Sequence, residues 1–181
     1  MTEKKALRAE IRAKIAALPQ ENILRGDRLI CERVLALPEA RAAKRVFTYY
    51  SVGREADTRA IIKTLRDWGK IIALPVVHGK GLMTFANIHD IEITDTDIPG
   101  AGISCAESAE RLTPARGDLL LVPALCYDRQ NYRLGQGGGY YDRYLTDCPA
   151  RSVGLCRAAL LVNRLPTEPH DVPVDIVVTD E

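Results

Sequence analysis

The residues with the clearest chemical potential lie between Arg133 and Leu145, in the sequence RLGQGGGYYDRYL. Four of the five residues from Gly135 to Gly139 are glycine, so backbone amides can approach one another there without interference from side chains. Converging amides carry partial positive charge and bind anions. The residues from Tyr140 onward predict a helix, whose free N-terminal amides would extend such a site. The pattern therefore predicts a cradle for a polyphosphate.

Two common nucleotide-binding patterns do not occur in the sequence. The P-loop pattern G-x-x-x-x-G-K-[ST] is absent. The dinucleotide pattern fails because Tyr140 stands where its last glycine would be. The remaining alternative to an anion site is a flexible hairpin turn. A turn alone needs neither the arginine before the glycines nor the Tyr-Tyr-Asp-Arg sequence after them.

Hydrophobic periodicity predicts the elements that position this glycine run. An apolar stripe of Leu7, Ile11, Ile15 and Leu18 predicts an amphipathic helix over residues 4–18. Further helices are predicted over 20–37 with Pro38 as the stop, from a cap at Asp57 or Thr58 to Trp68, and over about 140–147. Strands are predicted at 45–50, 71–77, 82–87, 118–123, 152–156 and 175–179. Residues 88–117 are punctuated by Pro and Gly and show no clear pattern.

Strands that alternate with helices predict an α/β fold. We expect residues 1–181 to form a single three-layer domain, with a mainly parallel sheet, helices on both faces and an N-terminal helical pair. Ligands of such sheets bind beyond the carboxyl ends of the strands. The glycine run follows the predicted strand 118–123 by about ten residues, so we expect it at that edge of the sheet.

Composition excludes several other classes of function. The 181 residues are 46% hydrophobic and 27% charged with a net charge of +1, which argues against general attraction to nucleic acid. No apolar run approaches the roughly 20 residues that span a bilayer, and no signal peptide is evident, so we expect a cytoplasmic protein without membrane contact. The three histidines match no zinc spacing. The five cysteines form no C-x-x-C pair and are expected to be reduced thiols.

The N-terminal 45 residues are more basic than the rest, with eleven Lys/Arg against six Asp/Glu. This surplus fits either a solvated helix face or a supply of cations to a phosphate site. The sequence pattern alone leaves both interpretations open.

Four segments together resemble one protein family. They are KKALR at the N-terminus, YYSVGREADT, LVPALCYDRQNYRLGQGGGYYDRYL and the tail LPTEPHDVPVDIVVT. In this order and spacing they resemble the 5-formyltetrahydrofolate cyclo-ligase family, also called 5,10-methenyltetrahydrofolate synthetases, over nearly the whole chain. The resemblance implies ATP-dependent conversion of 5-formyltetrahydrofolate to 5,10-methenyltetrahydrofolate with release of ADP and phosphate.

The implied reaction explains which residue types the site needs. Phosphorylation turns the formyl oxygen into a good leaving group, and the second amine of the folate then closes the ring. The protein must align the formyl oxygen with the γ-phosphate and neutralise charge there. No enzyme nucleophile is required, in agreement with the absence of a recognisable Ser-His-Asp or Cys-His arrangement.

The resemblance also implies roles for individual residues. Arg133 is the expected catalytic cation over the transferring phosphoryl group, and Asp142 and Asp171 are the expected ligands of Mg²⁺. The expected ATP-binding residues are Lys4, Lys5, Arg8, Arg133, Leu134, Gly135, Gln136, Gly137, Gly138, Gly139, Tyr140 and Tyr141. The expected folate-binding residues are Arg8, Tyr50, Glu55, Gln136, Gly137, Gly138, Gly139 and Tyr140. The carboxylate of Glu55 suits the paired N–H donors of a reduced pterin.

The chain departs from the family pattern at three positions. Gly138 stands where some members carry lysine, Asn131 replaces a glycine, and Cys126 replaces a larger aromatic residue. Asparagine tolerates the left-handed backbone conformation, so the turn at Asn131 is expected to survive. Two other functions stay open on the same fold: a non-catalytic folate or nucleotide-binding module, and a small-molecule kinase.

Overall fold

The computed structural model of the chain describes residues 3–79, 81–88 and 109–181, and its described strands include a seven-stranded sheet. The strand order is β4-β3-β2-β1-β5-β8-β9. Strands β2, β1, β5, β8 and β9 run parallel, whereas β3 pairs antiparallel with both β2 and β4. The strands are β1 Arg45–Phe47, β2 Ile71–Gly79, β3 Leu82–Asn87, β4 Arg111–Leu112, β5 Leu119–Val122, β8 Arg151–Leu155 and β9 Ile176–Val178. The predicted α/β fold with a mainly parallel sheet is confirmed.

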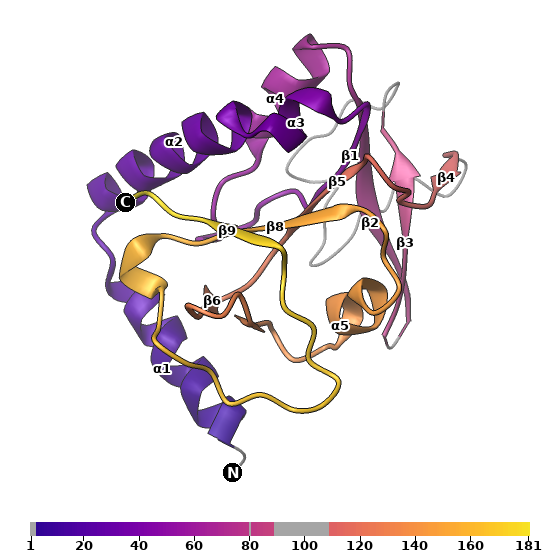
Figure 1. Cartoon of the computed structure of the whole chain (residues 1–181). Coiled ribbons are helices and arrows are strands. Elements are labelled where there is room, and N and C mark those ends of the chain that lie inside the picture. The colour runs from indigo at the N-terminus through magenta and orange to yellow at the C-terminus, as the bar shows by residue number, and fades with distance from the viewer. Residues whose placement is uncertain (1–2, 80, 89–108) are drawn as a thin grey trace.

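Two layers cover the faces of this sheet (Figure 1). One face packs against α2 Gln20–Ala36, α3 Pro38–Ala42 and α4 Arg59–Asp67. The other face packs against α1 Glu3–Ala17, α5 Tyr140–Leu145, the hairpin of β6 Cys126–Tyr127 and β7 Arg133–Leu134, and the 3-10 helix η2 Ala158–Leu160. Neighbouring strand residues alternate between the two cores: Val46 lies in the first and Phe47 in the second.

Several predicted boundaries were wrong. The strand predicted to reach Tyr50 ends at Phe47, because the chain leaves the sheet where the Thr58 hydroxyl donates to the carbonyl of Tyr49. Pro38 ends the second helix but also begins α3, where a proline loses no helical hydrogen bond. The hairpin of β6 and β7 was not predicted, since strands of two residues show no periodicity. Most of the weakly patterned stretch 88–117 lies outside the described residues.

The sheet contains one point where the strand order reverses. From β1, the chain adds β2 on one side and later β5 on the other. Loops that leave the carboxyl ends of β1 and β5 therefore diverge and open a crevice between them. The segments Tyr49–Tyr50 and Pro123–Ala124 follow directly after these two ends.

The four described cysteines are free thiols, as predicted: Cys31, Cys126, Cys148 and Cys156. Cys105, predicted to be a reduced thiol, and His89, predicted not to bind zinc, lie outside the described residues. Among the described helices, none combines the length and the apolarity needed to cross a membrane.

Gly154 of β8 is required by its neighbour Tyr127. A Cβ at position 154 would collide with the Tyr127 ring, which is fully buried and donates its hydroxyl to the carbonyl of Val122 at 2.7 Å. We therefore expect Gly154→Ala to lower the free energy of unfolding by about 1–3 kcal/mol through overpacking. Urea denaturation measures this, with Gly135→Ala as control, because a Cβ at Gly135 meets nothing within 4 Å. Equal losses in both variants would contradict the steric explanation.

Candidate active site

A cavity with a volume of about 580 Å³ lies at the carboxyl ends of β1 and β5. This size suits an organic ligand or cofactor. Its lining comes from α1, the segment after β1, β2, the segment after β5, the glycine run and the tail around residue 170. The lining residues are Lys4, Arg8, Tyr49, Tyr50, Val52, Glu55, Leu74, Pro75, Pro123, Ala124, Arg133, Leu134, Gly135, Gln136, Gly137, Gly138, Gly139, Tyr140, Tyr141, Asp142, Glu168, His170 and Asp171.

The cavity thus brings together every predicted site residue except one. Lys5 is exposed on α1 and does not line it. Sequence reasoning did not identify the apolar wall, which includes Leu74, Pro75, Pro123 and Ala124. The rule that ligands bind beyond strand ends could have pointed to the last two, because they directly follow β5.

The glycine run links β7 to α5 and is held from one side by α1. The Arg8 guanidinium donates through Nε to the carbonyl of Gly135 at 2.8 Å, and Arg12 donates to the side-chain oxygen of Gln136 at 2.8 Å. Gly137 and Gly139 have φ values of 103° and 66°, in the left-handed region that glycine tolerates without strain. The basic face of α1 therefore contacts the glycine run directly.

Gly138 has a steric reason to be glycine in this chain. Any Cβ at this position would lie 2.5 Å from Cε2 of Tyr140, so the tyrosine ring occupies the space that a side chain would need. A lysine at position 138 would require Tyr140 to move. Asn131 has a φ of 67°, which confirms the predicted left-handed turn. Cys126 is buried in the second core and does not line the cavity, and nothing in the structure explains its smaller size.

Two cations in the cavity are each paired with a carboxylate. The Lys4 ammonium contacts Asp171 at 2.6 Å and Glu168 at 2.7 Å. Burial acts to lower the pKa of Lys4, but these hydrogen bonds outweigh it and raise the pKa. Burial likewise acts to raise the pKa of Asp171, yet the Lys4 bond holds it below its usual value. Both groups are therefore held in their charged forms.

Arg133 forms the second pair and is almost fully enclosed. Its side chain is 3% exposed, and it donates to Asp142 at 2.5 Å and to the carbonyl of Val172 at 2.7 Å. The arginine thus connects β7 to α5 and to the C-terminal tail. The two predicted metal ligands, Asp142 and Asp171, consequently lie beside the two predicted phosphate-binding cations Arg133 and Lys4.

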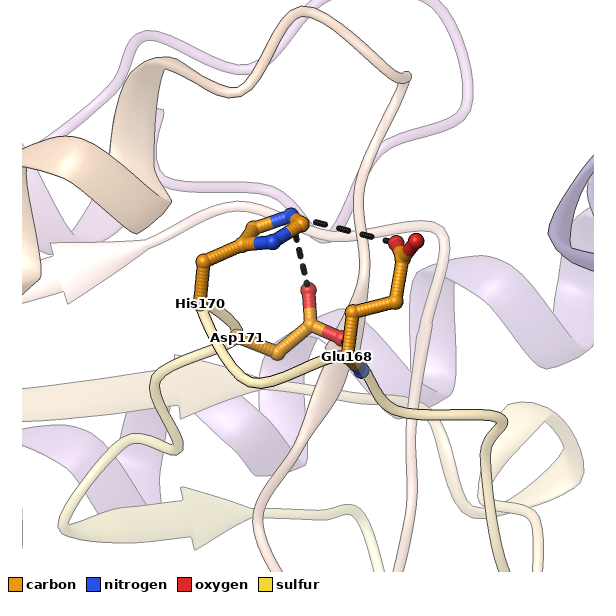
Figure 2. A group of neighbouring side chains, drawn as sticks. All are labelled: Glu168, His170 and Asp171. Carbon is orange, nitrogen blue, oxygen red and sulfur yellow. Dashed lines mark hydrogen bonds and ion pairs between the residues drawn. The ribbon is translucent and has the colours of Figure 1, made fainter.

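Three side chains near residue 170 could hold a metal ion (Figure 2). Donor atoms of Glu168, His170 and Asp171 all lie within 4.8 Å of one another, and Asp142 is not a member of this described group. Carboxylate oxygens suit Mg²⁺, whereas the imidazole nitrogen suits it less well. Lys4 contacts one oxygen of Asp171, and the other lies 4.0 Å from His170. The carboxylates fit a hard cation, which would compete with Lys4 for them.

Glu55 lies on a tight turn after β1 and is half-buried. Its carboxylate accepts a hydrogen bond from the Val52 amide at 3.0 Å, and its own amide donates to the Val52 carbonyl at 3.2 Å. Burial raises the pKa of the Glu55 carboxyl, partly opposed by the Val52 amide. Because the Val52 amide is its one donor among the described residues, this carboxylate retains acceptor capacity for a ligand in the cavity.

The cavity lining also includes a phenol without a hydrogen-bond partner. The Tyr141 hydroxyl is buried and has no hydrogen-bond partner among the described residues. Burial raises the pKa of Tyr141, and the charge of Glu55 adds to the effect, so the group is a neutral donor. A buried polar group without a partner costs stability, which suits a site completed by a ligand.

Comparison with known proteins agrees with this geometry. The 5-formyltetrahydrofolate cyclo-ligase family matches residues 1–180. The chain is 33% identical to the 5-formyltetrahydrofolate cyclo-ligase of Haemophilus influenzae, over 93% of this chain and 92% of that protein. It is 29% identical to the protein of that name from Mus musculus, over 98% of this chain and 94% of that protein.

A solved structure also resembles the whole fold. The structure of the 5,10-methenyltetrahydrofolate synthetase of Aquifex aeolicus superposes with a TM-score of 0.84 at 29% identity and covers 99% of this chain and 91% of its own. Sequence and structure therefore agree over the same length, and the chain belongs to the 5-formyltetrahydrofolate cyclo-ligase family.

Proposed function

We propose that the protein is a 5-formyltetrahydrofolate cyclo-ligase that uses ATP and Mg²⁺ and acts through the cavity described above, with residues 1–181 as its catalytic domain. The observation that carries this proposal is the convergence of three chemical elements on one cavity. Cations from α1, the glycine run with Arg133, and the carboxylate of Glu55 all line it. Free thiols among the described cysteines suit a reducing compartment, which supports a cytoplasmic location.

The proposed reaction assigns one task to each part of the cavity. Lys4, Arg8 and the amides of the glycine run bind the phosphates of ATP. Glu55 accepts hydrogen bonds from the aminopyrimidine edge of the pterin. The formyl oxygen then forms a bond to the γ-phosphorus while the bond to ADP breaks, and Arg133 neutralises the charge on the transferring group. The second folate amine attacks the activated carbon and loses its proton. Phosphate departs with the electrons of the C–O bond and carries that proton away as hydrogenphosphate.

The ion pairs in the cavity give a physical reason for ATP and magnesium to bind together. A bound Mg²⁺ supplies positive charge that neutralises phosphate oxygens. Lys4 and Arg133 would exchange Asp171 and Asp142 for phosphate oxygens, and the two released carboxylates would become available to the metal. Nucleotide without metal would leave both carboxylates unpaired near the phosphates.

One assay separates this function from the two alternatives. The purified protein with 5-formyltetrahydrofolate and MgATP is expected to develop the methenyl chromophore and to release one ADP for each ring closed. Binding of both ligands without a chromophore would indicate a non-catalytic module. Accumulation of a phosphorylated folate without ring closure would indicate a kinase.

The metal assignment makes a separate prediction. Asp171→Asn and Asp142→Asn should each raise the Mg²⁺ concentration for half-maximal activity by about tenfold or more, because each removes a charged oxygen ligand. Titration of activity with Mg²⁺ measures this. Asp67→Asn is the control, because it also removes a carboxylate that pairs with a lysine, Lys63, but Asp67 does not line the cavity. An equal effect in the control would assign the change to a general loss of negative charge instead of loss of a metal ligand.

A further inference from the structure

Arg157 is a buried arginine at the back of the Glu55 turn. It follows β8, and its side chain is 4% exposed. It does not line the large cavity but a neighbouring one of about 240 Å³. A buried guanidinium requires partners for its donors. Nη1 and Nη2 have partners, whereas Nε has none among the described residues.

The guanidinium connects three segments. Nη1 donates to the carbonyl of Arg54 at 2.9 Å, and Nη2 donates to the carbonyl of Glu55 at 2.9 Å and to the carboxylate of Asp27 on α2 at 2.8 Å. Asp27 balances the buried charge. One planar guanidinium thus donates to two consecutive carbonyls of the turn. The two Nη groups of arginine permit this geometry, and a lysine ammonium does not reproduce it.

The same turn is fixed from its other side. The Arg54 side chain donates to the carbonyls of Ile15 and Leu18 at 2.9 and 2.8 Å, at the C-terminal end of α1. Among the described residues, in contrast, the Glu55 carboxylate accepts a hydrogen bond from the Val52 amide alone. The position of this carboxylate in the cavity therefore depends on the backbone of the turn, and Arg157 holds the two carbonyls nearest to it.

We propose that Arg157 is a positioning residue that fixes the Glu55 carboxylate for folate through the carbonyls of Arg54 and Glu55. This inference rests on the proposed function, in which Glu55 binds the pterin. Without the guanidinium the turn shifts, and a displacement on the order of 1 Å at a binding group can lower catalytic efficiency about 100-fold. The ATP-binding elements belong to other segments, so their geometry is retained.

The decisive experiment compares Arg157→Lys with Arg45→Lys. Arg45 is the control because it too pairs with a carboxylate and donates to a backbone carbonyl, those of Asp118 and Thr113, but at the opposite end of the sheet strands. For Arg157→Lys we expect kcat/KM for 5-formyltetrahydrofolate to fall by about 10- to 100-fold. The dissociation constant of ATP should stay at the wild-type value. Arg45→Lys should lower thermal stability and leave both ligand affinities unchanged.

Several outcomes would overturn the inference. If Arg157→Lys weakens folate and ATP binding equally, or leaves the folate kinetics unchanged, Arg157 has only a structural role. If Arg157→Lys does not fold, Asp27→Asn takes its place, because it keeps the guanidinium and removes the charge that pairs with it. This variant should weaken folate binding, but not ATP binding, to a smaller degree. Unchanged folate binding would again refute the role. If the wild-type protein closes no folate ring, the proposed function is refuted. If the wild type is active but the Arg157 variant keeps its folate affinity, only the role of Arg157 is refuted.

Discussion

Arg133→Ala is expected to lower kcat by about 1,000-fold or more, the magnitude associated with loss of an arginine that neutralises a transferring phosphoryl group. The side chain reaches the cavity from β7 and is enclosed by its neighbours. A preorganised cation in a water-excluded site stabilises developing charge more than a solvated one does. Single-turnover measurements with saturating MgATP and folate isolate this chemical step from binding.

The structure also predicts that this variant loses stability, which the sequence had not suggested. Removal of Arg133 leaves the Asp142 carboxylate and the Val172 carbonyl without their donor, and breaking a buried ion pair costs up to about 3–5 kcal/mol. Because the Asp142 side chain is 28% exposed, the loss of stability should be about 3 kcal/mol or less.

A double variant separates the two effects. Arg133→Met with Asp142→Asn removes both charges, so thermal stability should recover relative to Arg133→Ala, while turnover stays low. Recovery of turnover together with stability would contradict a catalytic role for Arg133. The single variant Asp142→Asn completes the comparison, because it keeps the arginine and frees it from its partner.

Glu55→Gln is expected to weaken binding of 5-formyltetrahydrofolate by about 10- to 100-fold, the cost of hydrogen bonds to a charged acceptor. The amide replaces one acceptor oxygen with a donor that opposes the N–H groups of the pterin. ATP affinity should be unchanged. Calorimetric titration of each ligand measures this, with Glu168→Gln as the control from the same cavity. Selective loss of ATP binding would show that Glu55 contacts ATP and not folate.

The pKa of Glu55 adds a pH dependence to the same variant. Burial raises the pKa above the ordinary value of 4.5, so the folded protein binds this proton more tightly than the unfolded chain does. The cost of ionising Glu55 is therefore absent below about pH 4.5, grows as the pH rises toward the raised pKa, and is constant above it. Glu55→Gln should gain stability over the wild type across that window. Melting temperatures of both proteins, measured from about pH 4 to about pH 8 in steps of about one pH unit, test this. If the melting temperature of Glu55→Gln fell relative to that of the wild type as the pH rose, the sign would be contradicted.

Local patterns predicted much of the fold, whereas most of the expected site residues came from the family resemblance. The stripe of Leu7, Ile11, Ile15 and Leu18 packs into the core as expected, because burial of an apolar helix face needs only the correct spacing. The left-handed turn at Asn131 was also predictable from residue type. The hairpin before the glycine run was not, since buried Asp128 organises it by accepting the amides of Gln130, Tyr132 and Leu165.

By itself, the sequence determined which chemical groups were available: a glycine run, a basic first helix, and the carboxylates of Glu55, Asp142 and Asp171. The glycine run and the basic helix were evident from residue type and spacing, whereas the expected roles of the carboxylates came from the family resemblance. Only the tertiary structure decided how the groups are paired. Lys4 contacts Asp171 from the other end of the chain, Arg133 holds Asp142, and Arg157 holds the turn of Glu55. Such pairs depend on strand order and on burial, because charges removed from water must find partners wherever the fold places them.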